Sequence, residues 1–268
     1  MDLAQSQKTM KTLSWKRPHI SLRFLLLPAS IAAGIGIWAL FVRVSALPAF
    51  ILPPPALVWE RFLRVAGDGT LLLHTLITLQ EVLLGLALGV LIASVLGYLL
   101  ANSVKLEKLL SPYIVASQSV PIVAIAPLLV IWFGTGLFSK VLICALIVFF
   151  PVLVNTIVGV RSVPEDLRDL MRSLEAGRWQ TLRMLEIPAA MPVLLGGLRM
   201  GATLSVIGAV VGEFVGADRG LGFLINVARG QYDTALVFVA VLTLVALAIA
   251  LYGVVVLMEK RFLGWQSH

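Results

Sequence analysis

Long stretches of apolar residues without any charge alternate with short polar stretches along the 268-residue chain. An α-helix rises ~1.5 Å per residue, so about 20 apolar residues cross the hydrocarbon core of a bilayer. Six stretches come near this length. They predict six membrane-spanning helices, at residues 24–42, 82–104, 109–139, 141–160, 192–212 and 234–258.

Two of these stretches have a second interpretation. The stretch 24–42 follows the basic segment 1–23, as the apolar part of a cleavable signal peptide would. That part usually has about 7–15 residues, so we favour a retained first helix. The stretch 109–139 is long for one helix and contains prolines, so we expect a broken or late-starting helix. These prolines are Pro112, Pro121 and Pro127.

The composition agrees with an integral membrane protein. The chain is 59% hydrophobic and 13% charged, with a mean hydropathy of +0.99. A soluble domain is about half apolar and a quarter charged, so a water-soluble enzyme is excluded. A disulfide scaffold is also excluded, because Cys144 is the single cysteine. The net charge of +7 is spread between the apolar blocks rather than gathered into a nucleic-acid-binding patch.

The basic residues also predict the topology. If both termini face the cytoplasm, the inner segments carry 15 Lys and Arg and the outer segments carry 6. Positive residues favour the cytoplasmic side. We therefore expect a basic cytoplasmic segment at 1–23, a membrane domain at 24–258 with a cytoplasmic loop at 161–199, and a cytoplasmic tail at 259–268. The expected location is a cell membrane, crossed several times.

The loop 161–199 has the pattern of two short amphipathic helices. Ser162 and Glu165 have capping-box spacing, and Pro164 suits a first helical turn. Gly177 is expected to end the first helix in a left-handed conformation, and Pro188 to end the second. The apolar residues of the two helices are Leu167, Leu170, Met171 and Leu174, then Trp179, Leu182 and Leu185. Periodicity alone leaves two interpretations open: a helix pair lying flat on the lipid, or an elbow that docks into a partner.

The stretch from Asp169 to Gln180, with its continuation Ile187 to Pro192, resembles the cytoplasmic "EAA" loop of a known family. That loop marks the membrane-spanning subunits of binding-protein-dependent ABC importers. The family pattern is Glu-Ala-Ala, three residues, Gly, nine residues, Ile, one residue, Leu-Pro. Here Glu175 stands where the family has its Gly, which suggests that Gly177 moves the turn or that the loop bends differently. Asp169, Leu170 and Met171 replace Glu-Ala-Ala, Leu185 replaces Ile, and Ile187-Pro188 replaces Leu-Pro.

Other stretches resemble the nitrate, sulfonate and taurine branch of this family. They are Leu52 to Trp59, Ser119 to Gly134 with Ser139-Lys140, Gly212-Glu213-Phe214, and Gly220-Leu221-Gly222. Within that branch, Gln118 to Pro127 looks more like permeases for riboflavin or thiamin pyrimidine precursors. The resemblance therefore implies import of a small nutrient: such a vitamin or precursor, or an anion of the sulfonate, taurine or nitrate type.

The resemblance implies the fold, the partners and the location, which is the inner membrane of a bacterial-type cell. The fold is that of an all-α type I importer permease with about six transmembrane helices and a two-helix cytoplasmic coupling elbow. Two permease subunits, identical or paralogous, form the pathway; an ABC ATPase dimer docks beneath them, and an external solute-binding protein delivers the cargo. The elbow contacts or turn would be Asp169, Leu170, Met171, Arg172, Leu174, Glu175, Ala176, Gly177 and Arg178. Arg172 and Arg178 would pair with acids of the ATPase or anchor the loop on the positive side.

Few polar residues are candidates for the transport pathway. Ser117, Gln118 and Ser119 lie beside Pro121, where a broken helix exposes backbone; ordinary interhelical hydrogen bonding explains them equally well. An acid at membrane depth, here Glu213, is a functional candidate. Its alternatives are a water-facing acid at a helix end, or a structural partner of Arg219 or Arg229. Glu81, at the start of its predicted span, is expected at the interface.

Other classes of function fit less well. No Walker A pattern occurs, so ATP hydrolysis must come from a partner, and we expect no catalytic residue, cofactor or metal. An intramembrane enzyme lacks a histidine within the predicted spans, because all three (His19, His74 and His268) fall outside them. The remaining alternative is an ion-coupled carrier or a channel without an ATPase, for which the amphipathic elbow has no obvious use.

Overall fold

A computed structural model describes residues 23–263, so residues 1–22 of the predicted N-terminal segment and 264–268 of the predicted tail lie outside it. The described chain is all-helical, with no strand in that range. Its elements are α1 Arg23–Ser45, α2 Pro55–Gly67, α3 Thr70–Ala101, α4 Val104–Gln118, α5 Ile122–Phe133, α6 Leu137–Arg161, α7 Glu165–Ser173, α8 Arg178–Thr181, the π-helical turn Leu182–Glu186, α9 Ile187–Gly216, α10 Leu221–Gly230 and α11 Thr234–Phe262.

The chain forms two units, residues up to Pro48 and residues from Ala49 onward. The described part of the first unit contains helix α1, whose apolar part Pro28–Ser45 is long enough to cross a membrane. The second contains all the other helices. Four further membrane-length helices lie in the second unit: α3, α6, α11 and the continuous helix Arg178–Gly216.

The third predicted span is broken, as the prolines suggested. Helices α4 and α5 together have the length and hydropathy of a span, but they meet at an angle of 94° around Ser119–Pro121. Pro121 precedes the first residue of α5 and cannot donate a backbone hydrogen bond, which allows the chain to turn there. With this bent pair counted once, the described residues contain six candidate spans, the predicted number.

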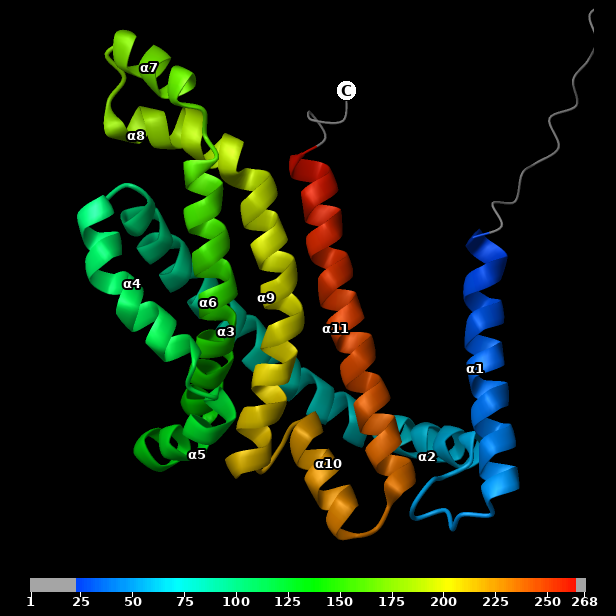
Figure 1. Cartoon of the computed structure of the whole chain (residues 1–268). Helices are drawn as coiled ribbons and strands as arrows, with labels where there is room; N and C mark the ends of the chain where they lie inside the picture. Colours follow the sequence, from blue (N-terminus) through cyan, green and yellow to red (C-terminus); the bar gives the residue numbers. More distant parts are fainter. Residues whose placement is uncertain (1–22, 264–268) are drawn as a thin grey trace, which may run out of the picture. The chain divides into compact units, whose positions relative to one another are not determined.

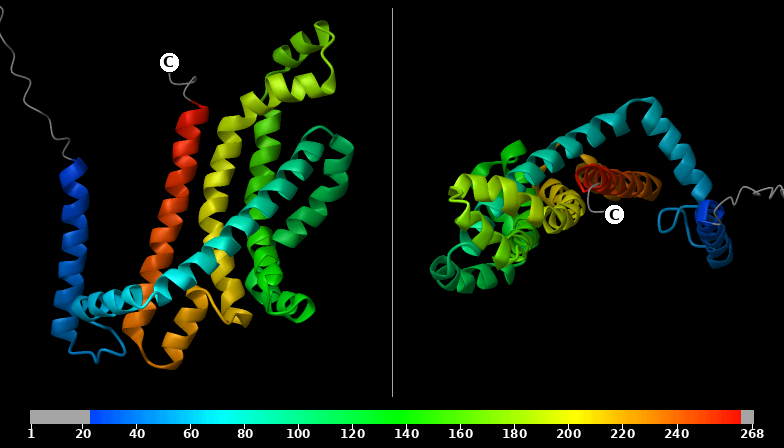
Figure 2. Two further views of the ribbon diagram at one scale, coloured as in Figure 1. Left: turned by 180° about the vertical axis from the view of Figure 1, so that it is seen from behind. Right: turned by 90° about the horizontal axis from the view of Figure 1, so that it is seen from above.

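Helices α3, α6 and α9 form the core of the second unit, with α6 lying between the other two (Figures 1 and 2). Small residues allow this close approach. A Cβ atom added to Gly85 of α3 would lie 2.2 Å from Cβ of Cys144, and one added to Gly208 of α9 would lie 2.7 Å from Cα of the same cysteine. Gly85 and Gly89 therefore pack α3 against α6, at the four-residue spacing typical of close membrane-helix contacts.

The two ends of the second unit differ. One end carries α7 and α8, with the last turn of α3 and the first turn of α4 beneath them (Figure 1); we call it the elbow end. The opposite end carries α2, α5 and α10. There, Arg61 of α2 forms an ion pair of 2.8 Å with Asp233, the residue that caps α11.

Two predicted boundaries were wrong. Helix α3 begins at Thr70, twelve residues before the predicted span, so His74 and Glu81 lie inside a membrane-length helix rather than outside it or at its start. Pro188 does not end a helix either, because Arg178–Gly216 is continuous. Proline has no N–H and its ring crowds the carbonyl one turn earlier, and the π-helical turn Leu182–Glu186 just before it provides a wider path.

Candidate functional site

The first candidate site is the elbow, residues Glu165 to Glu186, which connects α6 to α9. Its helix α7 begins with Glu165 and Asp166, acids that favour a helix N-terminus. The leucines of this helix and of its cap are exposed, whereas Met171 is half-buried: Leu167 is 42% exposed, Leu170 53% and Leu174 67%. Trp179 of α8 is 68% exposed. The predicted amphipathic helix is thus present, and its leucines face outward.

The predicted start of α7 was wrong by a few residues. Pro164 is the capping residue, and the Ser162 hydroxyl donates to the carbonyl of Gly159 instead of capping α7.

The turn of the elbow lies at Glu175 rather than at Gly177, contrary to expectation. Glu175 has a φ of 53°, in the left-handed region. The Ala176 N–H donates to the carbonyl of Met171 and the Glu175 N–H to that of Arg172, the pair of bonds that defines a Schellman helix end. Gly177 has an ordinary φ of −66° and instead precedes α8, where its N–H donates to Oε1 of Gln180. The position at which the importer family has glycine thus keeps the glycine conformation in this chain.

Buried and exposed ion pairs hold the elbow in place. Arg168 donates to the carbonyl of Val160 at 2.8 Å and lies 3.6 Å from the carboxylate of Glu186, which is 5% exposed. These contacts tie α7 to the end of α6 and to the π-helical turn. Arg172 pairs with Asp169 at 2.6 Å and with Glu165 at 3.4 Å, both on its own helix and both exposed. The fixing role of Arg168 and Glu186 was not predicted.

The second candidate site is a buried polar cluster near the opposite end of the unit. Glu81 of α3, Lys140 of α6 and Glu213 of α9 are 1%, 4% and 1% exposed. The Lys140 ammonium lies 3.2 Å from Oε1 of Glu81, and Oε1 of Glu213 accepts a hydrogen bond of 2.7 Å from the Thr78 hydroxyl. Buried charges persist only when they are paired and hydrogen-bonded. The cluster joins the three core helices through charged groups.

This cluster also caps helix α10. The N–H groups at the start of a helix have no partner within it. Here the N–H of Gly220 donates to Nδ1 of His74 at 2.9 Å and that of Leu221 to Oγ1 of Thr78 at 2.8 Å, while that of Gly222 donates to Oε2 of Glu213. Side chains of α3 and α9 therefore supply the cap, and a carboxylate lies at the positive end of the helix.

Glycine is required where the chain passes Glu213. Gly220 has a φ of 113°, and a Cβ atom there would lie 2.2 Å from Oε1 of Glu213. A Cβ atom on Gly222 would lie 2.8 Å from Oε2 of the same carboxylate. The two sequence stretches Gly212-Glu213-Phe214 and Gly220-Leu221-Gly222 therefore meet in space.

The predictions for Glu81 and for the alternatives at Glu213 need correction. Glu81 is buried against Lys140 and does not lie at the interface. Glu213 does not face water, and its partners are Thr78 and Gly222 rather than Arg219 or Arg229.

The three other pathway candidates lie together at the bend between α4 and α5, and all are exposed. The hydroxyls of Ser117 and Ser119 donate to backbone carbonyls of their own helix. Gln118 is the last residue of α4. These three side chains are exposed, whereas Glu213 belongs to the buried polar cluster.

Comparison with known proteins identifies the class of this membrane protein. Residues 85–264 match the family of binding-protein-dependent transport system inner membrane components, and the chain belongs to this family. Its members are permease subunits of ABC importers rather than enzymes, and they work with an ATPase and a substrate-binding protein. The chain is accordingly a multi-pass inner-membrane permease subunit.

Several relatives are similar over nearly their whole length. The riboflavin transport system permease protein RibX of Chloroflexus aurantiacus is 48% identical over 241 residues, covering 90% of each chain. The formylaminopyrimidine transport permease protein ThiX of Halalkalibacterium halodurans is 33% identical over 231 residues, covering 86% of this chain and 92% of the relative. The taurine transport system permease protein TauC of Escherichia coli is 33% identical over 265 residues, covering 96% of this chain and 95% of the relative.

A solved structure shares the fold. A chain from the crystal structure of an amino acid ABC transporter with histidines superposes with a TM-score of 0.58 at 20% identity, covering 74% of this chain and 96% of that one. The all-α importer-permease fold predicted from the sequence is confirmed.

Proposed function

We propose that this chain, together with a second permease subunit, forms the membrane pathway of an ATP-driven importer of riboflavin. One observation carries the choice of substrate: identity to the riboflavin permease is 48%, against 33% for the permeases of formylaminopyrimidine and taurine, at comparable coverage. The second subunit is a copy of this chain or a paralogue. An external binding protein delivers the vitamin, and a pair of ATPase subunits supplies the energy.

The elbow end faces the cytoplasm in this proposal. The distribution of basic residues supports this orientation, because the segments 1–23, 105–108, 161–199 and 260–261 carry 15 of the 21 Lys and Arg. Residues 1–23 and 259–268 then flank a membrane domain of residues 24–258, and both termini lie inside.

The elbow is the contact surface for the ATPase. Its exposed apolar side chains, Leu170 and Leu174, suit insertion into a groove of a partner, as amphipathic helices do. Closure of the ATPase pair would displace α7 and α8, and the continuous helix Arg178–Gly216 would carry that displacement into the membrane. The set of contact and turn residues remains Asp169, Leu170, Met171, Arg172, Leu174, Glu175, Ala176, Gly177 and Arg178.

The pathway runs past the bend between α4 and α5. Ser117, Gln118 and Ser119 are exposed there and offer hydroxyl and amide groups to a polar vitamin. Glu213 acts on the pathway indirectly, because it fixes the start of α10 at the end of the unit that lies away from the elbow.

Uptake into proteoliposomes tests this function. The chain is reconstituted with its ATPase and binding protein, and the uptake of labelled riboflavin, formylaminopyrimidine and taurine is compared. We expect riboflavin uptake that requires both ATP and the binding protein. Saturable uptake of another of these solutes without riboflavin uptake would show that riboflavin is not the substrate. Uptake driven by an ion gradient without the ATPase would overturn the mechanism.

A further inference from the structure

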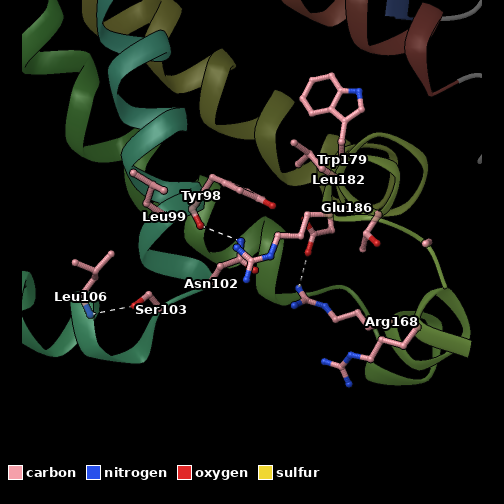
Figure 3. Close-up of a pocket in the computed structure, with 13 residues that line it drawn as sticks. Tyr98, Leu99, Asn102, Ser103, Leu106, Arg168, Trp179, Leu182 and Glu186 are labelled. Carbon is pink, nitrogen blue, oxygen red and sulfur yellow. Dashed lines mark hydrogen bonds and ion pairs between the residues drawn. The ribbon is translucent and has the colours of Figure 1, made fainter.

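A basic cleft of about 810 Å³ lies beneath the elbow. Figure 3 shows its two walls: Tyr98, Asn102 and Ser103 from the end of α3 and the turn that follows it, and Arg168 and Trp179 from the elbow. The cleft therefore opens where a membrane-spanning helix ends and polar chain begins. The polar headgroups of a bilayer, with their phosphates, lie just outside the hydrocarbon core, at the level where membrane-spanning helices end.

The charges that line the cleft do not balance. Three arginines line it, Arg168, Arg172 and Arg178, against one carboxylate, Glu186. Arg168 uses that carboxylate, and Arg172 is held by two acids of its own helix. Arg178 forms no ion pair within residues 23–263. Nε of Arg168 is buried without a hydrogen-bond partner. The cleft thus has more positive than negative charge, and the guanidinium of Arg178 is available to an anion.

An apolar track leads from the membrane into the same cleft. Leu99 lines the cleft and is 48% exposed; Val95 and Ile92, one and two turns back on the same face of α3, are 56% and 48% exposed. An acyl chain fits along this track, and Trp179 has the amphipathic ring typical of membrane interfaces. A free phosphate ion would use only the basic part of the site.

We propose that this cleft binds the phosphodiester group of an anionic phospholipid, such as phosphatidylglycerol, whose acyl chain lies along Leu99, Val95 and Ile92. Arg178 donates to the phosphate and Arg168 adds positive charge beside it, since arginine is suited to phosphate recognition. The hydroxyl of Ser103 and the amide of Asn102 are polar groups at the opposite wall. Basic pockets at the ends of membrane helices bind anionic headgroups in this way. The bound lipid would link the elbow to the α3–α4 turn.

Quenching of tryptophan fluorescence tests the site in the full-length purified chain. Phosphatidylglycerol with a nitroxide on its acyl chain is titrated into detergent micelles, with nitroxide-labelled phosphatidylcholine as the neutral comparison. The contribution of Trp179 is the difference between the wild type and Trp179→Phe. We expect the anionic lipid to quench the fluorescence of Trp179 saturably, at concentrations at which the neutral lipid causes little quenching.

Two variants provide a matched comparison. Arg178→Gln should weaken the apparent affinity for labelled phosphatidylglycerol roughly fivefold, the effect of one arginine at a membrane surface. Arg183→Gln removes an equal charge from the elbow at a place that does not line the cleft, and it should leave the affinity unchanged. Native mass spectrometry provides an independent check: the Arg178→Gln variant should retain less phosphatidylglycerol than the Arg183→Gln variant.

Three results would overturn the proposal. The first is equal quenching by the anionic and the neutral lipid. The second is complete displacement by millimolar inorganic phosphate, which would make the site one for a free ion. The third is an Arg178→Gln variant that binds lipid normally but loses the ATPase, which would assign the arginine to a protein partner.

Discussion

The buried polar cluster and the elbow place charged and apolar side chains in opposite ways. In the cluster, Glu81, Lys140 and Glu213 are almost fully buried and are bonded to one another's helices or to the start of α10. In the elbow, Leu170 and Leu174 are exposed, and Arg172 pairs with Asp169 on the surface. The cluster finds its ion pair and most of its hydrogen bonds within the chain, leaving only Oε2 of Glu81 without a partner among the described residues, whereas the elbow leaves apolar surface for something else to cover.

The caps of the two short helices show the same contrast. Helix α10 begins on side chains supplied by α3 and α9, so its position depends on the core. Helix α7 ends through its own backbone in the Schellman turn at Glu175. A change in the cluster should therefore alter the fold, and a change at the elbow tip should alter binding while the fold persists. The following substitutions test this difference, from the largest expected effect to the smallest.

Lys140→Met should destabilise the protein most. The change leaves the carboxylates of Glu81 and Glu213 buried without a cation, and breaking a buried ion pair costs about 3–5 kcal/mol. Thermal unfolding in detergent measures the loss. The double variant Lys140→Met/Glu81→Gln should recover a large part of it, because the unpaired charge is removed as well. A single variant as stable as the wild type would show that the ion pair is dispensable.

Gly220→Ala should destabilise the start of α10. The new Cβ atom meets the Glu213 carboxylate, and the left-handed φ of 113° adds strain, which together cost on the order of 2 kcal/mol. Faster hydrogen exchange at the amides of residues 220–224 should accompany a lower melting temperature. Gly230→Ala, at the other end of the same helix, is the control, because nothing lies within 4 Å of its added Cβ atom. Equal effects of the two variants would contradict the capping role of Glu213.

Leu174→Arg should weaken the association with the ATPase without unfolding the chain. The side chain is 67% exposed, so the free subunit loses little packing, while an apolar contact residue in a protein interface commonly contributes about 1–2 kcal/mol. Co-purification of the ATPase with the tagged permease should fall roughly tenfold at the same melting temperature. Leu174→Met, which keeps an apolar side chain of similar volume, should retain the ATPase. Unchanged co-purification of the arginine variant would assign Leu174 to the lipid surface.

Glu175→Gly should stabilise the elbow turn slightly. Glycine adopts the left-handed conformation without the steric cost that glutamate has there, about 1 kcal/mol. Hydrogen exchange at residues 173–177 should slow. Gly177→Ala should be tolerated, because Gly177 has a φ of −66° and an added Cβ atom would lie 3.6 Å from its nearest neighbour, Oε1 of Gln180. If Gly177→Ala destabilised the elbow and Glu175→Gly did not stabilise it, the turn would lie at Gly177 instead.

The sequence predicted most of the fold because the membrane requires long apolar helices. The number of spans, the break near Pro121 and the amphipathic helix α7 all followed from length, proline content and periodicity. The start of α3 was missed because residues 70–81 include polar side chains, and a buried charge looks the same in sequence as an exposed one. A pattern was nevertheless present: His74, Thr78 and Glu81 are spaced as one helical face, and Gly85 and Gly89 continue it.

The elbow and the cluster were predictable to different degrees. The elbow is a local structure, so its helices could be predicted, but its turn depends on which residue adopts a positive φ, and a glycine two positions away was misleading. The cluster joins residues more than 130 positions apart, such as Thr78 and Glu213. No local pattern shows that contact.

The glycine contacts between α3, α6 and α9 also constrain how this permease can move. At Gly85, Gly97 and Gly208 the neighbouring helix lies so near that a single added carbon would overlap it, which leaves no clearance for these helices to slide or rotate past one another. They should travel as one rigid body while the bend between α4 and α5 absorbs the change in angle. Spin labels on the outer faces of α6 and α9 would then report one separation in every nucleotide state, and labels on α5 and α9 would report more than one.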